Sequence, residues 1–310
     1  MISQRTQLGK TGMLVSRLGY GSMGIRGPRT WGIRVVDDSG ADRILNAVLD
    51  SGINLIDTSP DYGASEERIG RFLSHRRDEF YLATKCGCVY TQQEDHLQLD
   101  HVWSRQVITN NLETSLKRLR CDFVDILQFH GGDAETLERE GLIECLQGFK
   151  RSGKVRFIGV STSLPKLPGM FELGVFDTYQ MPYSLLAPEH ESWIQKIGQA
   201  GSGVIIRGGI AQGGPDAVIQ RPANNDVWQK ANLDRWIDES TSRAELILRY
   251  TLSNPHCHST IVGTCDHRHL AENIAAVAKG PLPLEWYKEL RQSVAAALAL
   301  SFPPESKTTT

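Results

Sequence analysis

Two residues at the end of one short apolar stretch carry side chains suited to acid–base chemistry. Residues 52–63 begin with an apolar run, reach Asp57 and then break at Pro60 before Tyr62. This pattern predicts a short buried strand that delivers a carboxylate and a phenol into the loop behind it. A purely structural role stays open at this point, because loop aspartates commonly accept hydrogen bonds from backbone N–H groups.

An amine and an imidazole occupy comparable positions farther along the chain. Lys85 and His130 each stand at the end of a short apolar run. A desolvated ammonium at Lys85 needs an anion, which Asp57 supplies. The same ammonium favours an ionised phenol, so we expect it to bring the pKa of Tyr62 nearer neutrality and to make this residue a proton donor and acceptor. We expect His130 to place an imidazole N–H against the same substrate oxygen.

The rest of the chain alternates short apolar runs with amphipathic stretches, which predicts strands that each lead into a helix. Eight such units in 310 residues indicate an α/β fold, a (β/α)8 barrel of the triosephosphate isomerase type formed by residues 1–310 as one domain. An open, doubly wound sheet is the alternative. We expect strands at residues 17–21, 54–57, 80–84, 123–129, 155–160, 176–180, 203–206 and 259–262.

The predicted helices complete this pattern. They lie at residues 40–50, 65–73, 104–119, 137–151, 166–173, 188–199, 241–253 and 270–278, with an extra C-terminal helix at 284–300. Residues 5–15 alternate around two glycines, which predicts a hairpin within residues 1–15 that caps one end of the fold. We expect residues 302–310 to form a disordered tail. Residues 24–36, 88–100 and 208–238 are expected to be the loops that set substrate selectivity.

Composition narrows the possible partners and location. The net charge is −2, and basic and acidic residues are mixed along the chain, so nothing predicts binding to nucleic acid or to a membrane surface. The first residues lack the apolar core of a signal peptide, and no run approaches the ~20 apolar residues of a membrane span. We therefore expect a cytoplasmic protein whose six cysteines are reduced thiols.

Two groups of cysteine and histidine residues are candidates for metal binding. Neither shows the four-ligand spacing typical of zinc, so we expect no metal. The groups are Cys86 with Cys88 beside Lys85, and His256, Cys257 and His258 with Cys265 and His267.

The four chemical residues and their setting carry a family resemblance. The chain resembles the aldo-keto reductases over nearly its whole length. The resemblance rests on Asp57, Tyr62, Lys85 and His130 and on the segment GINLIDTSPDYGASEERIG at residues 52–70. The resemblance implies NAD(P)H-dependent reduction of an aldehyde or ketone on a (β/α)8 barrel. It also implies that Tyr62 is the general acid, that Lys85 and Asp57 tune it, and that His130 orients and polarises the carbonyl.

The resemblance further implies a nicotinamide site with two departures from the usual pattern. Gln180 matches the glutamine that binds the carboxamide, and Ser161 matches the serine of a Ser-Asn pair. Thr162 stands in place of the asparagine, and a hydroxyl offers one donor where a carboxamide offers two. Arg207 stands where many members have a stacking aromatic residue, and its planar guanidinium can stack on the nicotinamide or reach the pyrophosphate.

Glycine-rich residues 208–214 are expected to cradle the pyrophosphate with backbone N–H groups. At the positions where family members usually place basic residues for a 2′-phosphate, this chain has Gly263 and His269, with Arg268 one residue out of step. The helix N-terminus there still favours an anion, and we expect NADP(H) in preference to NAD(H). The expected cofactor-binding residues are Gly21, Ser22, Met23, Asp57, Ser161, Thr162, Gln180, Arg207, Gly208, Ile210, Gln212, Gly213, Gly263, Thr264, His269, Glu272 and Asn273.

Three hypotheses about function remain open from the sequence. The first is a reductase that acts on a small-molecule carbonyl. The second is a barrel that binds the nucleotide and senses redox state for a partner protein with little turnover, which fold alone does not exclude. The third is acid–base catalysis without a cofactor, such as isomerisation, which failure to bind either nucleotide would indicate.

Overall fold

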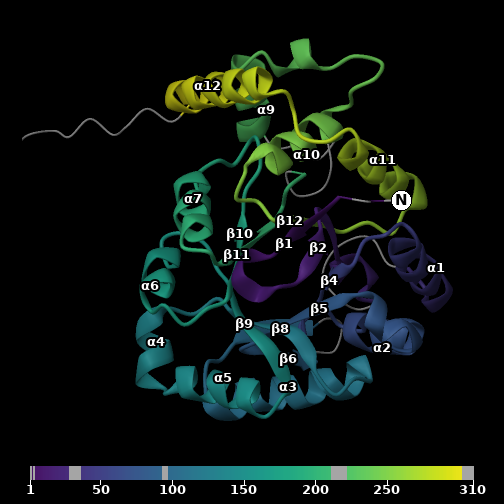
Figure 1. The fold of residues 1–310 in the computed structure, drawn as a ribbon, viewed down its shortest axis with the longest axis vertical. Helices are drawn as coiled ribbons and strands as arrows, with labels where there is room; N and C mark the ends of the chain where they lie inside the picture. Colours follow the sequence, from purple (N-terminus) through teal and green to yellow (C-terminus); the bar gives the residue numbers. More distant parts are fainter. Residues whose placement is uncertain (1, 3, 28–35, 93–96, 211–221, 302–310) are drawn as a thin grey trace, which may run out of the picture.

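The computed structural model describes residues 2, 4–27, 36–92, 97–210 and 222–301. Among them, eight parallel strands close into a barrel (Figure 1). Each strand pairs with the next barrel strand along the chain, and the last pairs with the first, which confirms the predicted barrel against the open sheet. The barrel strands are β3 (Leu18–Gly21), β4 (Leu55–Asp57), β5 (Tyr81–Cys86), β8 (Val124–His130), β9 (Val155–Ser161), β10 (Thr178–Pro182), β11 (Gly203–Arg207) and β12 (Ser259–Val262).

Helices surround the barrel and bury one apolar face each against it (Figure 1). Several begin at side-chain caps: Ser104 accepts a hydrogen bond from the Val107 N–H, and Asp266 accepts one from the Arg268 N–H. The surrounding helices are α1 (Asp38–Asp50), α2 (Ser65–Leu73), α3 (Arg105–Leu119), α5 (Leu142–Arg151), α6 (Leu167–Glu172), α7 (Glu191–Gln199), α10 (Arg243–Ser253) and α11 (His267–Ala278).

A hairpin closes the N-terminal end of the barrel, as predicted. Strands β1 (Arg5–Gln7) and β2 (Leu14–Ser16) are antiparallel. The turn between them lies so close to the barrel that a Cβ atom at Gly9 would come 2.4 Å from the Gly203 nitrogen. The side chains of the hairpin join the interior side chains of the barrel in one apolar plug, formed by Leu8, Met13, Val15, Leu55, Ala83, Ile126 and Ile205. Only the opposite end, where the strands have their carboxyl ends, is left for chemistry.

Two of the predicted segments are corrected by the structure. The single helix expected at 137–151 is split into α4 (Ala134–Arg139) and α5, because Gly141 takes a left-handed conformation with φ 62°. The segment expected to be irregular at 208–238 contains α9 (Pro222–Lys230) and the 3-10 turn Leu233–Trp236. Helix α9 packs beside the C-terminal helix α12 (Leu284–Ser301) and buries Trp228, so tertiary packing overrides a composition typical of loops (Figure 1).

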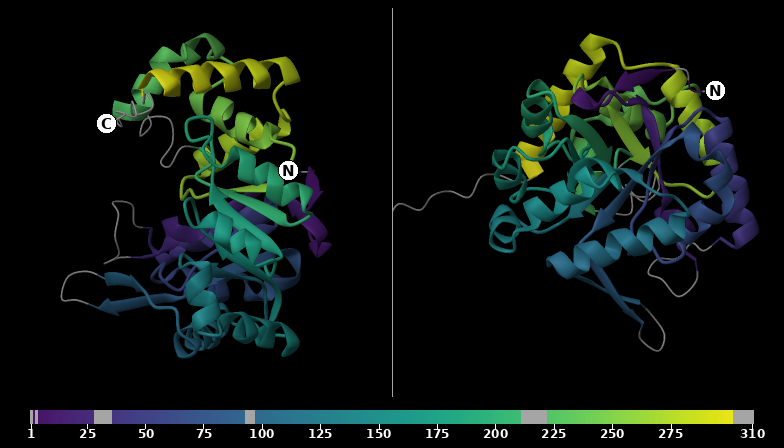
Figure 2. Two further views of the ribbon diagram at one scale, coloured as in Figure 1. Left: turned by 90° about the vertical axis from the view of Figure 1, so that its left-hand side faces the viewer. Right: turned by 60° about the horizontal axis from the view of Figure 1, so that its bottom comes forward.

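A second hairpin was not predicted and lies in the expected loop 88–100. Strands β6 (Cys88–Gln92) and β7 (Leu97–His101) pair antiparallel and project from the barrel on the side away from β1 and β2 (Figure 2). Residues 97–100 alternate between apolar and polar, a strand signal that the prediction of a loop passed over. The predicted tail 302–310 lies outside the described residues. Within the described part of the chain, no helix has the length and apolar character needed to cross a membrane.

Gly70→Ala should destabilise the barrel, because a Cβ at Gly70 in α2 would lie 2.0 Å from the carbonyl oxygen of Arg118 in α3. Overpacking of this kind lowers the unfolding free energy by about 1–3 kcal/mol, which a lower urea midpoint would report. Gly148→Ala in α5 is the matched control: its Cβ would meet only the Arg151 side chain, at 3.9 Å. There we expect a gain of roughly 0.5–1 kcal/mol from helix propensity. Equal midpoints for wild type and Gly70→Ala would contradict this account of the helix contact.

Candidate active site

Strand alternation places a layer of polar side chains directly above the apolar plug. Side chains two positions apart on a strand lie on the same face. In three neighbouring strands an apolar residue of the plug is followed two positions later by a polar one: Leu55 by Asp57, Ala83 by Lys85, and Ile126 by Gln128. The plug therefore fixes which residues line the open end of the barrel.

Asp57 is the centre of this layer, and it is fully engaged by hydrogen bonds. Its Oδ2 accepts from Lys85 Nζ at 2.8 Å, and its Oδ1 accepts from Gln128 Nε2 at 2.7 Å and from Gln180 Nε2 at 2.8 Å. Lys85 Nζ also donates to the Thr58 carbonyl oxygen at 2.8 Å. All five residues are buried. Burial opposes the charge on Lys85, but the negative charge of Asp57 and the neighbouring Tyr62 outweigh it and raise the pKa of this lysine.

Tyr62 lies in the loop after β4, with its ring close to this ion pair. The Tyr62 N–H donates to the Ser59 carbonyl oxygen at 3.0 Å, and Gly63 follows with a positive φ of 53°, so the chain turns back over the barrel mouth. Lys85 Nζ is 4.9 Å from the centroid of the Tyr62 ring. Burial raises the pKa of Tyr62 by more than Lys85 lowers it, so the expected shift toward neutrality is wrong for this structure. The phenol is therefore protonated at neutral pH.

His130, the last residue of β8, lies beside the same group of charges. Burial and then the positive charge of Lys85 lower the pKa of His130 to about 3. The imidazole is thus neutral at physiological pH and carries one proton. Its Nδ1 is 3.1 Å from Cys88 Sγ and 3.2 Å from His101 Nε2.

The residues expected to hold the nicotinamide continue the network around the barrel wall. Ser161 Oγ donates to Gln180 Oε1 at 2.9 Å, and Gln180 Nε2 in turn donates to Asp57. The Thr162 N–H donates to the Gln180 carbonyl oxygen at 3.0 Å, and its side chain is buried. Arg207 lies two positions after the plug residue Ile205 on β11, so its side chain is directed to the same mouth. Burial lowers the pKa of Arg207, while Tyr62 and Asp57 oppose this effect. These hydroxyl, amide and guanidinium groups suit a carboxamide and an anion.

The residues expected around the remainder of the cofactor lie at the carboxyl ends of β3, β11 and β12. Gly263 follows β12 and packs against Gly21 so closely that a Cβ on it would come 2.8 Å from the Gly21 carbonyl oxygen. Ser22 is buried and its Oγ hydrogen-bonds to Ser65 Oγ at 2.7 Å, so its side chain supports the loop. Met23 is 38% exposed. Gly208 and Ile210 follow β11, whereas the expected Gln212 and Gly213 lie outside the described residues.

The start of α11 carries the basic residues near the expected phosphate pocket. Helix α11 begins three residues earlier than predicted, so Arg268 and His269 lie in its first turn. Arg268 Nη2 is 3.2 Å from His269 Nε2, and Arg268 Nη1 is 3.7 Å from Glu272 on the exposed helix surface. Tyr20 Oη donates a hydrogen bond to the Thr264 carbonyl oxygen at 3.0 Å. Asn273 is buried.

Three residues of the site were given no role from the sequence: Asp61, His101 and Gln128. Gln128 could have been found from alternation, since it lies two positions after the apolar Ile126 and two before His130. Cys88 was considered only as a metal ligand, and it is brought to His101 by the hairpin that was expected to be a loop.

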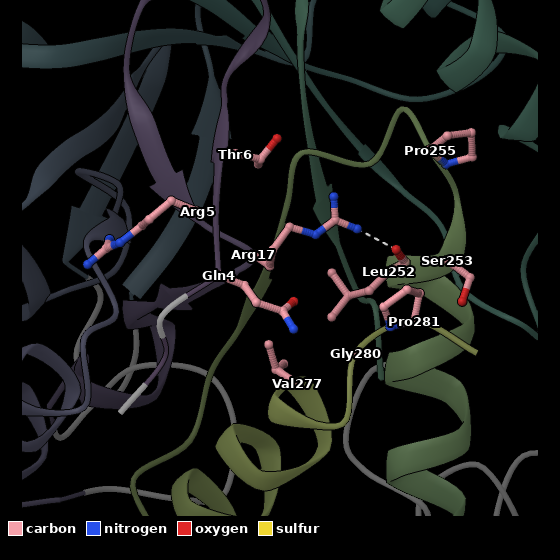
Figure 3. A pocket seen from close by; sticks show the side chains of 10 residues that line it. All are labelled: Gln4, Arg5, Thr6, Arg17, Leu252, Ser253, Pro255, Val277, Gly280 and Pro281. Carbon is pink, nitrogen blue, oxygen red and sulfur yellow. Dashed lines mark hydrogen bonds between the residues drawn. The ribbon is translucent and has the colours of Figure 1, made fainter. Parts of the chain in front are cut away.

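Figure 3 shows a pocket that shares no lining residue with this site. Arg17 Nη2 donates to the Leu252 carbonyl oxygen within it. It lies beside β1 and the starts of β3 and β12, on the side where the hairpin plug closes the barrel, and we assign it no chemistry. Its lining residues are Gln4, Arg5, Thr6, Arg17, Leu252, Ser253, Pro255, Val277, Gly280 and Pro281.

Comparisons with known proteins agree with this geometry. Residues 17–295 match the model of the Aldo/keto reductase family. The chain is 29% identical over 301 residues to L-galactose dehydrogenase of Arabidopsis thaliana, covering 88% of this chain and 87% of the relative. It is 29% identical over 279 residues to the NADH-specific methylglyoxal reductase of Escherichia coli, covering 81% and 83%. The structure of an aldo-keto reductase from Bacillus halodurans in its holo form matches with a TM-score of 0.78 and 28% identity, covering 95% and 96%.

The network around Asp57 predicts unequal effects of removing either partner of its ion pair. Asp57→Asn should lower the unfolding free energy by about 3–5 kcal/mol, because it leaves the buried Lys85 ammonium without an anion. Lys85→Met should lower the unfolding free energy by less, since Gln128 and Gln180 still donate hydrogen bonds to Asp57. Urea unfolding of both single variants and of the double variant would measure this. A larger loss for Lys85→Met than for Asp57→Asn would contradict the assignment.

Proposed function

Because this chain belongs to the aldo/keto reductase family, we propose that it reduces an aldehyde or ketone to an alcohol with NAD(P)H. The observation that carries the proposal is the position of the Tyr62 ring, 4.9 Å from Lys85 Nζ in the buried Lys85–Asp57 pair, at the open end of the barrel. The bound nicotinamide would supply the hydride for the carbonyl carbon. The residues that would hold the nicotinamide are Ser161, Thr162, Gln180 and Arg207.

Tyr62 has the protonation state that a general acid for reduction requires. Its O–H bond breaks as the proton passes to the carbonyl oxygen, which leaves a phenolate at the barrel mouth. The Lys85 ammonium stabilises that negative charge, and Asp57 keeps the ammonium in place through its 2.8 Å hydrogen bond. A proton from solvent then restores the phenol.

His130 supports the same step as a neutral hydrogen-bond donor. A neutral imidazole keeps one N–H, which can donate to the carbonyl oxygen and polarise it without competing for the proton of Tyr62. The contacts of His130 Nδ1 with Cys88 and His101 fix the ring and leave Nε2 as the nitrogen available to the substrate.

We propose NADPH as the preferred cofactor on the basis of the first turn of α11. Arg268 and His269 lie there beside the helix N-terminus, and a 2′-phosphate would find both positive charge and backbone N–H groups. Glu272 faces Arg268 on the same surface and weakens this field. One relative is named for NADH specificity, so cofactor choice varies among the proteins that resemble this chain.

Tyr62→Phe should lower kcat for NADPH-dependent reduction of a small aldehyde by about 10²- to 10⁴-fold, because the proton donor is lost. The Kd for NADPH, measured by quenching of tryptophan fluorescence, should stay unchanged. Tyr81→Phe is the matched control: this tyrosine lies at the start of β5, away from the mouth, and its variant should keep turnover. Unchanged turnover in Tyr62→Phe would refute the mechanism. Tight cofactor binding by wild type without turnover on a panel of aldehydes and ketones would instead favour the redox-sensing alternative.

Arg268→Ala should raise the KM for NADPH about tenfold or more, the effect of losing a charge-assisted hydrogen bond of about 1.5–3 kcal/mol. The KM for NADH should not change, because NADH lacks the 2′-phosphate. Lys279→Ala at the far end of α11 removes the same charge away from the pocket and serves as the control. Equal increases for both cofactors in Arg268→Ala would argue against a phosphate contact.

A further inference from the structure

Four side chains with metal-binding atoms converge on one point beside Tyr62. They are Asp61, Cys88, His101 and His130, and one ligand atom from each lies within 4.8 Å of the others. His130 Nδ1 is the common neighbour: Cys88 Sγ is 3.1 Å from it, His101 Nε2 is 3.2 Å and Asp61 Oδ2 is 3.9 Å. The residues come from the loop after β4, the start of β6, the end of β7 and the end of β8.

Hydrogen bonding leaves part of this cluster unsatisfied. A neutral imidazole Nδ1 has either one N–H or one lone pair, so it cannot make full hydrogen bonds to both Cys88 and His101. Cys88 Sγ has one further contact, to Ser59 Oγ at 3.7 Å. Asp61 is only 6% exposed: its Oδ2 is 3.9 Å from His130 Nδ1, and its Oδ1 is buried with no hydrogen-bond partner among the described residues. Unpartnered buried carboxylate oxygens are costly, which indicates that the cluster suits a cation.

The surrounding residues hold these ligands in place. Cys88 and His101 are the first and last residues of the hairpin formed by β6 and β7, and they pair directly across it. The Asn111 side chain accepts from the Cys88 N–H at 3.1 Å and donates to the Cys88 carbonyl oxygen at 2.9 Å. Trp103 Nε1 donates to the His130 carbonyl oxygen at 2.9 Å and its ring stacks on His101. Such support around ligands is typical of metal sites.

We propose that Asp61, Cys88, His101 and His130 bind one Zn²⁺ ion. With Zn–S near 2.3 Å and Zn–N near 2.0–2.1 Å, tetrahedral coordination separates S from N by about 3.6 Å and N from N by about 3.3 Å. The corresponding separations here are 3.1 and 3.2 Å, and the carboxylate oxygen is 3.9 Å from Nδ1. The other ligand atoms lie within 4.8 Å of one another, so side-chain rotations that draw them together complete the site. The mixed set of one sulfur, two imidazole nitrogens and one carboxylate favours zinc over magnesium or calcium.

The charges and protons of the complex balance. Binding displaces the Cys88 thiol proton to solvent, and the thiolate and the Asp61 carboxylate together neutralise the ion. A neutral complex avoids adding positive charge next to Lys85, whose field already acts on His130. Four protein ligands leave no open position, so the ion is structural and fastens the hairpin to the barrel mouth. Coordination through Nδ1 leaves the His130 proton on Nε2. The site itself does not rest on the reductase assignment.

Zinc affinity tests the proposal directly. Chelator-treated full-length protein should bind one Zn²⁺ per chain in competition with a chromophoric chelator. Residues that only support a metal ligand contribute about 10- to 100-fold to metal affinity, so Asn111→Ala should weaken zinc binding by that factor. His101→Gln removes a ligand itself and should weaken zinc binding at least about 100-fold. The half-buried His256 lies before β12 outside the cluster, so His256→Gln is the matched control and should bind like wild type. His101 is exposed, so its replacement should leave the fold intact.

Co²⁺ in place of Zn²⁺ reports the sulfur ligand by its thiolate charge-transfer absorption. Wild type and Cys121→Ser should show this band, and Cys88→Ser should lack it. The proposal is overturned if wild type binds no Zn²⁺, if His101→Gln and His256→Gln bind equally, or if the band persists in Cys88→Ser. Tyr62→Phe separates the two proposals: it should lose turnover and retain zinc, so failure of either leaves the other standing.

Discussion

The buried ion pair between Asp57 and Lys85 is the interaction on which the rest of the site depends. Two charges at this depth are tolerated only when both are paired and their remaining hydrogen-bonding capacity is filled. Asp57 meets that requirement with donors from three different strands, β5, β8 and β10. The same hydrogen bonds therefore tie the barrel wall together and fix where the ammonium stands relative to Tyr62.

That arrangement depends in turn on the apolar plug beneath it. The hairpin side chains fill the N-terminal end of the barrel, so water reaches the polar layer from one end only. Because strand side chains alternate strictly, the plug residues and the polar layer cannot be changed independently. A one-residue shift of β5 would exchange Lys85 for Thr84 at the mouth and leave the Asp57 carboxylate unpaired.

Strands buried on both faces and separated by amphipathic helices are recognisable locally, which is why the barrel, its hairpin cap and helix α2 were predictable from sequence. Helix α9 depends on packing against the distant helix α12, and its local composition argues against a helix. The β6–β7 hairpin is local, and the alternation at residues 97–100 could have indicated it. Asp57, Lys85 and Tyr62 were predictable because each stands in or just after a strand end. The pKa of Tyr62 was not, because the effect of burial depends on the loop that covers the phenol.

The two hairpins have opposite physical roles in the same barrel. The N-terminal hairpin seals the barrel with the apolar side chains of Leu8, Met13 and Val15. A hydrogen bond from the Lys10 N–H to the Gly201 carbonyl oxygen at 2.8 Å helps to fix it there. The β6–β7 hairpin extends outward from the barrel (Figure 2), and its base carries Cys88 and His101 against His130. The Asn111 side chain hydrogen-bonds to the Cys88 backbone there. Directional bonds therefore position this base, and the zinc ion that we propose would add four more.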